Sequence, residues 1–383
     1  IYLDGNSLGV MPAAAPARVK EATEQQWGDR LIRSWAEGWA DLPKRVGDKI
    51  ARLIGAEENE VMAADSTSVN LFKMLNAALK MRADRKVILT EPGNFPTCLY
   101  AAEGAVELLA NGAALRFVEA DKIIEAIDES VAVVMLTHIN FRSSAMHDLA
   151  AITAAAHAKG AMVLWDLAHS AGSVPLDMKA AKVDFAVGCG YKYLNGGPGA
   201  PGYFYVRRDL QNQVFPSVRG WWAHTDPLDF AKEFTPADGL RRNLSGTPPI
   251  LSMTALDAAL DAWDGVDIAD VRKKSISLTE TFIALVEKEC AGLGLTLATP
   301  RDPSLRGSHV SLHHDHGYQV SKAMTARGVI GDFRTPNLLR YGFAPLYLSH
   351  ADVFDAVAHL ADILRNEVWR EPRFERPRAA GWR

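Results

Sequence analysis

LAAITAAAHAKGAMVLWD (149–166) decides the fold class, because a helix pattern is followed in it directly by a strand pattern. Its first part, 149–160, is rich in alanine and ends in Lys-Gly, as helices commonly do. Its second part, 161–166, is a short apolar run, and a similar run, VAVVMLTH (131–138), precedes the helix. A strand, a helix and a second strand in this order predict a parallel pair of strands covered by a helix.

The same alternation of short apolar runs and alanine-rich stretches extends from about residue 47 to residue 206. It predicts further strands at 86–90, 114–119, 184–188 and 202–206. We therefore expect an α/β fold whose large domain has a mostly parallel mixed sheet covered by helices on both faces. Such sheets bind ligands beyond the carboxyl ends of their strands, which directs attention to Asp166 and Lys192.

The C-terminal part of the chain predicts a second, smaller domain of the α+β class. Helical periodicity returns at 249–263, after a polar segment at 207–247. We expect helices within 266–292 and at 350–369, and strands near 308–313 and 340–345. The predicted organisation is an N-terminal segment (1–46) contributing to the small domain and the active site, a large cofactor-binding domain (47–247), and a connecting helix with the small domain (248–383).

Composition excludes several classes of protein. The chain has 383 residues, 48% apolar residues and a net charge of −4, without a basic stripe typical of nucleic-acid or membrane-surface binding. No apolar run approaches the roughly 20 residues that span a bilayer, and no signal peptide is recognised. The chain begins at Ile1 without an initiator methionine, so we expect a leading segment to be missing.

The three cysteines, Cys98, Cys189 and Cys290, are an odd number at long spacings. This spacing fits neither a disulfide framework nor a zinc site, and no metal is expected. Free cysteines are typical of a reducing compartment, so the cytoplasm is the expected location.

A carboxylate and a lysine follow two of the predicted strands. Asp166 ends one strand, and Lys192 follows it by 26 residues, just beyond the next strand. Pyridoxal phosphate requires this pair, because a lysine amine binds its aldehyde and a carboxylate pairs with its protonated pyridine nitrogen. Its phosphate needs further donors, which Thr67 and Ser68 supply at the start of a predicted helix.

Each of these signals also has an ordinary structural explanation. Thr67 and Ser68 could simply cap their helix, and Asp166 could cap the one that follows it. His169 alone is more often a satisfied polar residue than a catalyst. The run GGPGAPG (196–202) does not fit the dinucleotide-binding pattern. The combination, in this order and at the ends of predicted strands, favours a cofactor site.

Over nearly its whole length, the chain resembles the kynureninase family, which has the type I pyridoxal-phosphate fold of aspartate aminotransferase. The matching motifs are IYLDGNSLG (1–9), STSVNLF (66–72), NFPT (94–97), WDLAHSAG (165–172), YKYLNGGPGAPG (191–202), GWW (220–222), SGTPPI (245–250) and LLRYGFAPLY (338–347). Other type I enzymes share part of the middle block. The first motif and the GWW and GTPP motifs are more specific to kynureninases.

The resemblance implies roles for the cofactor-binding residues. Lys192 would be the Schiff-base lysine, and Asp166 would pair with the pyridine nitrogen, with His169 beside it. Phe95 would stack on the cofactor ring. Thr67 and Ser68 would hold the phosphate together with Tyr191, which would also be a proton donor if nearby cations lower its pKa.

The resemblance also implies a substrate and a partner. The reaction would be hydrolysis of L-kynurenine, and of 3-hydroxykynurenine, to anthranilate or its 3-hydroxy form and L-alanine in tryptophan catabolism. Arg340 would clamp the substrate carboxylate, although an arginine at a strand edge could equally face water. Trp221 and Thr247 would reach the site of a neighbouring subunit in a homodimer, and Trp39, Trp221 and His224 are candidates for the wall of the ring pocket.

The chain departs from the family pattern at three positions. Cys98 stands where the family usually has aspartate, Phe141 where tyrosine is common, and Ser144 where glycine is usual. These changes leave the predicted cofactor site intact and bear on substrate preference and turnover.

Two other functions compete with this one. A cysteine desulfurase would need a nucleophilic cysteine on a mobile loop, and the only cysteine after Lys192, Cys290, lies in a helical stretch. A kynureninase-like protein with an altered substrate, or one that has lost catalysis and acts as a regulator, would keep the fold. Lys192, Asp166, Tyr191 and Arg340 are all present, and no DNA-binding domain is recognised, which favours an active enzyme.

Overall fold

The computed structural model describes residues 1–109 and 112–376 and divides them into two compact units. The larger unit comprises Gly9–Asn140 and His147–Val266, and the smaller one comprises Ile1–Leu8, Phe141–Met146 and the chain from Asp267 onward. The domain boundaries expected at residues 47 and 248 stay predictions. Among the described residues, no helix combines the length and apolar content that crossing a bilayer requires.

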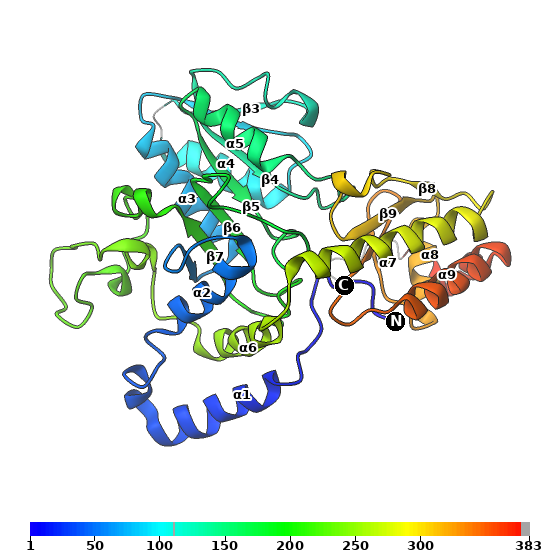
Figure 1. Cartoon of the computed structure of the whole chain (residues 1–383), viewed down its shortest axis with the longest axis horizontal. Helices are drawn as coiled ribbons and strands as arrows, with labels where there is room; N and C mark the ends of the chain where they lie inside the picture. The colour runs from blue at the N-terminus through cyan, green and yellow to red at the C-terminus, as the bar shows by residue number, and fades with distance from the viewer. Residues whose placement is uncertain (110–111, 377–383) are drawn as a thin grey trace. The chain divides into compact units, whose positions relative to one another are not determined.

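The larger unit contains a seven-stranded sheet, as the mostly parallel α/β prediction requires (Figure 1). In spatial order its strands are β1 (Val61–Ala63), β7 (Gly202–Val206), β6 (Phe185–Cys189), β5 (Met162–Asp166), β4 (Val131–Thr137), β2 (Val87–Thr90) and β3 (Ala114–Phe117). The strands from β3 to β6 are parallel, whereas β7 is antiparallel to both of its neighbours. All the strands predicted for this unit are present.

Helices cover both faces of this sheet. The helices of the larger unit are α1 (Ala15–Glu21), α2 (Leu42–Ile54), α3 (Thr67–Met81), α4 (Pro96–Leu109), α5 (Leu149–Ala158) and α6 (Ile250–Leu260), of which α1 packs on α6. Leu164 of β5 packs in one core with α3 and α4. The next residue, Trp165, donates from its indole N–H to Thr153 Oγ1 of α5 at 3.2 Å. Successive strand side chains point to opposite faces, so α5 lies on the face opposite α3 and α4.

The smaller unit has an antiparallel sheet packed against three helices. The strand order is β10 (Asp332–Arg334), β11 (Leu338–Gly342), β9 (His309–His313) and β8 (Thr296–Leu297), and the helices are α7 (Ile268–Glu289), α8 (Gly317–Ala326) and α9 (His350–Arg365). Aromatic side chains fill the core between them, including Phe282, Tyr341 and Phe343. The α+β prediction holds, but β11 begins two residues before the predicted strand at 340.

Short helical turns complete the described chain. These are a π-helix at Ala22–Arg30 and 3₁₀ turns at Leu31–Trp35, Ala120–Lys122, Arg208–Gln213, Trp221–Ala223, Gly239–Asn243, Asp261–Trp263, Pro303–Leu305, Val368–Arg370 and Pro372–Phe374. The helix predicted to reach residue 369 therefore ends at Arg365 and continues as a 3₁₀ turn.

Candidate active site

The carboxyl ends of neighbouring parallel strands bring polar residues together in the larger unit. Asp166 ends β5 and pairs in register with Thr137, the last residue of β4. Cys189 ends β6, and Lys192 follows three residues later. This is the edge at which sheets of this type bind ligands, as the sequence predicts.

Asp166 is buried without a close cation among the described residues. Its Oδ1 accepts from the backbone N–H of Ala168 at 2.9 Å, and its Oδ2 accepts from the Cys98 thiol at 3.4 Å. Burial raises the pKa of this carboxyl, and the positive charge of Lys192 acts in the opposite direction. A buried carboxylate short of positive charge can pair with a cationic ligand atom such as a protonated ring nitrogen.

Lys192 lies half-buried between two aromatic rings. Its Nζ is 6.0 Å from the centroid of the Phe95 ring and 5.9 Å from that of Tyr191. Gly9 packs on the turn that carries it, donating its N–H to Tyr191 O at 2.7 Å. A Cβ on Gly9 would lie only 2.3 Å from Lys192 O, so glycine is required here. This contact explains why the opening motif ends in glycine.

The N-terminus of α3 carries the hydroxyls of Thr67 and Ser68, and the Thr67 hydroxyl donates to Gly188 O at 3.1 Å. Ser66 is the N-cap, with its Oγ accepting from Val69 N–H, so Thr67 and Ser68 occupy the first helical positions and are not the cap. The first N–H groups of a helix have no acceptor within it and favour anions. Gly202 lies against this end, where a Cβ would be 2.8 Å from Thr67 N. The arrangement fits a bound phosphate.

A buried ion pair holds the residue that precedes this helix. The Lys73 ammonium donates to Asp65 Oδ2 at 2.7 Å and to Asn243 O at 2.6 Å. Ser245 Oγ donates to the same Asp65 oxygen at 3.1 Å. The pair therefore ties the start of α3 to the SGTPP segment. Sequence reasoning missed Lys73, because a lysine within a helix pattern gives no sign that it is buried.

Tyr191 and His169 lie near this edge. Burial raises the pKa of the Tyr191 hydroxyl, and the Cys189 thiol beside it adds to the effect. This is the opposite of the lowering that we expected from nearby cations. His169 is buried one turn after Asp166, with its backbone carbonyl accepting from Ser173 Oγ at 2.6 Å.

The remaining candidates of the larger unit are Trp39, Trp221, His224 and Thr247, and the two tryptophans belong to one aromatic cluster. Trp39 and Trp222 both pack on Trp35, and Trp221 packs on Trp222 with ring centroids 4.7 Å apart. His224 has backbone carbonyls beside both of its ring nitrogens, those of Asp226 at 2.7 Å and Glu233 at 3.3 Å. Trp221 and Thr247 are exposed. The described contacts do not bring these residues to Lys192, and their roles stay predictions.

Arg340 lies in the smaller unit, on β11, and it is buried. Its Nε donates to Asp332 Oδ1 at 2.9 Å, and a terminal nitrogen contacts the other oxygen of the same carboxylate. The other terminal nitrogen donates to Phe141 O at 2.7 Å, and Ser7 Oγ accepts at 2.9 Å from the terminal nitrogen that contacts Asp332. Arg340 therefore does not face water. Asp332 and Ser7, which hold it, were not predicted.

Two of the three departures from the family pattern lie in this unit. Phe141 contributes its carbonyl to Arg340. Ser144 has a φ of +66° and is fully buried, and its hydroxyl has no hydrogen-bond partner among the described residues. A positive φ explains why glycine is usual at this position.

His138, which follows β4, is a further buried residue that the sequence did not single out. Its Nδ1 lies 2.9 Å from Ser170 Oγ, and its backbone N–H donates to Asp166 O at 3.0 Å. Burial, followed by the charge of His147, lowers the pKa of His138 to about 3. The imidazole is therefore neutral in the folded protein.

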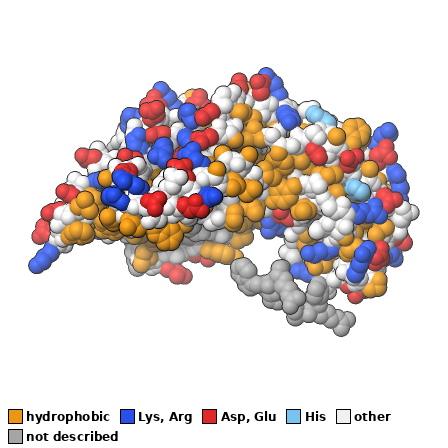
Figure 2. Space-filling model, turned by 90° about the horizontal axis from the view of Figure 1, so that it is seen from below, with side chains coloured by type: hydrophobic (Ala, Val, Ile, Leu, Met, Phe, Trp, Pro, Cys, Tyr) orange, Lys and Arg blue, Asp and Glu red, His pale blue; other side chains and the backbone are white. Residues whose placement is uncertain are grey.

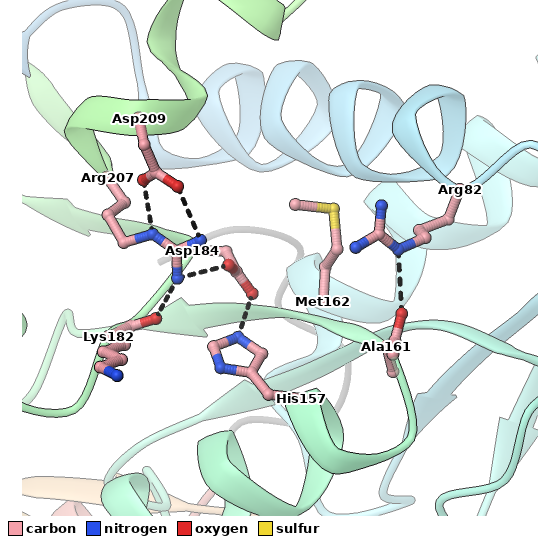
Figure 3. A pocket seen from close by; sticks show the side chains of 9 residues that line it. Arg82, His157, Ala161, Met162, Lys182, Asp184, Arg207 and Asp209 are labelled. Atoms are coloured by element: carbon pink, nitrogen blue, oxygen red, sulfur yellow. Dashed lines mark hydrogen bonds and ion pairs between the residues drawn. The ribbon is translucent and has the colours of Figure 1, made fainter.

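A second pocket lies at the amino ends of β5 and β6, opposite the strand ends that carry Asp166 and Cys189 (Figure 3). Asp184 accepts there from His157 Nε2 at 2.8 Å and from Val163 N–H at 2.9 Å, and it pairs with Arg207 at 3.0 Å. Arg207 also pairs with Asp209 at 2.7 Å. Because the carboxylates of Asp184 and Asp209 are paired with Arg207 inside the pocket, we assign the pocket a structural role.

Comparison with known proteins identifies the family. A family model for the kynureninase C-terminal domain matches residues 271–360. The kynureninase of Pseudomonas fluorescens is 48% identical over 381 residues, covering 98% of this chain and 92% of that protein. The kynureninase of Burkholderia mallei (strain SAVP1) is also 48% identical, covering 98% and 91% of the two chains.

Solved structures show the same fold at low sequence identity. The apo cysteine desulfurase of Thermococcus onnurineus NA1 has a TM-score of 0.82 at 18% identity, covering 96% of this chain and 95% of its own. The cystine C-S lyase C-DES, in complex with cysteine persulfide, has a TM-score of 0.81 at 18% identity, covering 94% and 97%. These likenesses establish the type I fold, and the sequence identity to the two curated proteins establishes that the chain belongs to the kynureninase family.

Proposed function

We propose that this protein hydrolyses L-kynurenine to anthranilate and L-alanine, with pyridoxal 5′-phosphate as its cofactor. The observation that carries the proposal is the convergence of Asp166, Lys192 and the N-terminus of α3 in a chain 48% identical to curated kynureninases. The cofactor agrees with this set of residues, which offers an amine, a carboxylate and anion-binding donors.

The residues of the larger unit would hold the cofactor in a defined way. Thr67 and Ser68 would bind the phosphate, Asp166 the pyridine nitrogen, and Phe95 would lie on the ring. When bound, pyridoxal phosphate supplies an aldehyde that captures amines and a protonated ring that stores the electron pair left at the substrate α-carbon. Asp166 serves this chemistry only while it is ionised, which makes its hydrogen bonds part of the mechanism.

Three residues would act on the substrate. Arg340, held on one edge by Asp332, would bind the α-carboxylate through its terminal N–H groups, in place of the Phe141 carbonyl and the Ser7 hydroxyl. Lys192 Nζ would take the proton from the α-carbon. After water adds to the side-chain ketone and the Cβ–Cγ bond breaks, the Tyr191 hydroxyl would donate a proton to the remaining β-carbon. Its raised pKa keeps the hydroxyl protonated until then.

The protein would act as a homodimer. Large apolar side chains are exposed in the larger unit, namely Met11, Trp27, Leu31, Ile32, Trp221, Leu228 and Phe230. Figure 2 shows that hydrophobic side chains form continuous areas on one face of the molecule. Exposed apolar areas of this kind are typical of protein interfaces. Trp221 and Thr247, both exposed, would complete the site of the second subunit.

Mutation of the proposed interface tests the shared site. Trp221→Ala would weaken dimerisation in analytical ultracentrifugation and cofactor affinity in parallel, while Phe354→Ala, at an exposed residue of α9, would change neither. Dissociated subunits that bind the cofactor as tightly as the dimer would contradict this part of the proposal.

Two structural observations bear on the alternative functions. Cys290 is buried at the C-terminal end of α7, which does not suit a cysteine desulfurase nucleophile. Substitution of the family aspartate by Cys98, which touches Asp166, is the observation that favours an altered substrate or lost catalysis.

The deciding experiment is anthranilate release from L-kynurenine by the purified, cofactor-loaded protein, with 3-hydroxykynurenine as the second substrate. Release that disappears in Lys192→Ala supports the proposal. Binding of the cofactor without release from either substrate would reject it.

A further inference from the structure

We propose that Cys98 is a positioning residue for the cofactor-binding carboxylate: its thiol donates a hydrogen bond to Asp166 Oδ2 and holds Asp166 ionised and oriented toward the ring nitrogen. The inference rests on the proposed function for the identity of the ligand. It concerns a residue at which this chain differs from the usual family pattern.

The geometry places the thiol directly on the carboxylate. Cys98 lies in the first turn of α4, is fully buried, and has its sulfur 3.4 Å from Asp166 Oδ2. The other carboxylate oxygen already accepts from Ala168 N–H at 2.9 Å. The thiol is therefore the side-chain donor that orients the second oxygen, and a carboxylate that accepts donors on both oxygens cannot rotate freely.

The surrounding hydrogen bonds determine the direction of the thiol proton. Phe95 N–H donates to Asn94 Oδ1 at 2.8 Å, which orients the Asn94 amide. Thr137 gives its only hydroxyl proton to the same oxygen. Thr137 Oγ1 lies 3.8 Å from the Cys98 sulfur and has no proton left to donate to it. The thiol proton is therefore available to Asp166, which is the stronger acceptor because it is charged.

The thiol stays protonated, so it remains a donor. Burial raises the pKa of Cys98 well above its usual value, and the negative charge of Asp166 raises it further. An aspartate at this position would behave differently. Two carboxylates in contact cannot both ionise easily, so one would retain a proton and the pair would titrate together. Cys98 thus replaces a titrating neighbour with a neutral donor over the working pH range.

The first measurement is the infrared S–H stretching band of the full-length protein, with and without cofactor. We expect Cys98→Ala to remove one band, and that band to lie at lower frequency than the one removed by Cys290→Ala. In Asp166→Asn the Cys98 band should move to higher frequency, because an amide oxygen is a weaker acceptor than a carboxylate. The proposal would be overturned if the Cys98 band has the same frequency as the Cys290 band and does not shift in Asp166→Asn.

The second measurement uses the bound cofactor. Cys98→Ala should raise the cofactor dissociation constant about three- to tenfold, the effect of losing one modest hydrogen bond, and Cys98→Ser should restore most of it. Cys98→Asp should add an inflection to the pH titration of the cofactor absorbance that Cys98→Ser lacks. Equal affinity and equal titration in all four proteins would also reject the proposal.

These readouts separate the two proposals. The infrared result depends only on Cys98 and Asp166, whereas kynurenine hydrolysis depends on the whole site. A shifted band without anthranilate release would leave the role of Cys98 standing and reject the substrate. Anthranilate release together with an unshifted Cys98 band would support kynurenine as the substrate and reject the role of Cys98.

Discussion

Two buried aspartates, at opposite ends of neighbouring strands in one sheet, have different hydrogen-bond partners and different expected roles. Asp184, just before β6, is surrounded by His157, Arg207 and the N–H of Val163. Among the described residues, the hydrogen-bond donors to Asp166, at the end of β5, are a backbone N–H and a thiol. Both are buried to a similar degree, so burial alone does not distinguish a structural carboxylate from a functional one.

The difference lies in the partners. A buried carboxylate is costly unless it is paired, and Asp184 has a cation, Arg207, within the chain. Asp166 has no cation in hydrogen-bond contact among the described residues, and burial raises its pKa, against the opposing charge of Lys192. A buried carboxylate left without a cation in a folded protein is therefore a sign that a ligand supplies the positive charge.

The largest expected effect is on the rate of anthranilate release, and it distinguishes Lys192, near Asp166, from Lys182, near Asp184. Lys192→Ala should reduce anthranilate release at least about a thousandfold, because it removes both the cofactor attachment and the base. Lys182→Ala, in the pocket at the other edge, should leave the steady-state rate unchanged. A comparable loss in both variants would show that the two edges are not functionally distinct.

The two aspartates themselves provide the next test. Asp166→Asn should lower kcat/KM at least about a hundredfold with little change in the urea midpoint, because its charge serves the cofactor. Asp184→Asn should instead lower the free energy of unfolding by about 2–3 kcal/mol, because it leaves Arg207 without its buried partner.

The activity per folded Asp184→Asn molecule should stay at the wild-type level. Loss of stability in Asp166→Asn with retained activity would reverse the assignment of the two sites.

A third test uses pH. The unfolded chain protonates His138 below about pH 6.5, whereas the folded protein, with a His138 pKa of about 3, does not. The free energy of unfolding should therefore fall with acidification from about pH 6.5 toward 3, and His138 should account for about 2 kcal/mol between pH 7 and 5.

Urea unfolding at both pH values measures this effect. His138→Gln should lose less stability on acidification than the wild type, and His350→Gln, at an exposed residue, should behave like the wild type. Identical pH dependence in all three proteins would show that His138 is protonated in the fold.

The smallest expected effect concerns Ser144. It tests whether a buried group without a partner can lower the free energy of unfolding without serving the function. Ser144→Gly should raise the free energy of unfolding by about 1–2 kcal/mol, because it relieves a positive φ and removes a buried hydroxyl without a partner. Ser143→Gly is the matched control and should destabilise, since Ser143 Oγ accepts from Ala145 N–H. Loss of kynurenine turnover in Ser144→Gly would indicate a functional role instead.

Much of the larger unit could be predicted from local patterns. The strands β2 and β4 to β7 were found because a buried strand is a short apolar run. The short strands β1, β8 and β10 were missed, since two or three residues carry no periodicity, and the helix α8 was missed as well.

Asp166 and Lys192 were predicted because strand ends and motif residues are visible in the sequence. Their partners were not. Cys98 and Asp166 are 68 residues apart, and Asp332 and Arg340 meet across an antiparallel pair. Such pairs have no fixed spacing, so no local pattern reports them.

By itself, the sequence determined the α/β class and the cofactor and singled out Asp166 and Lys192 as candidates, because periodicity and motifs of fixed spacing are visible in it. The tertiary structure alone decided which buried charges are neutralised. It placed the Arg207 guanidinium beside Asp184, a thiol beside Asp166 and a carboxylate beside Arg340. The charge state of a buried group depends on neighbours brought from distant parts of the chain, and only folding brings them together.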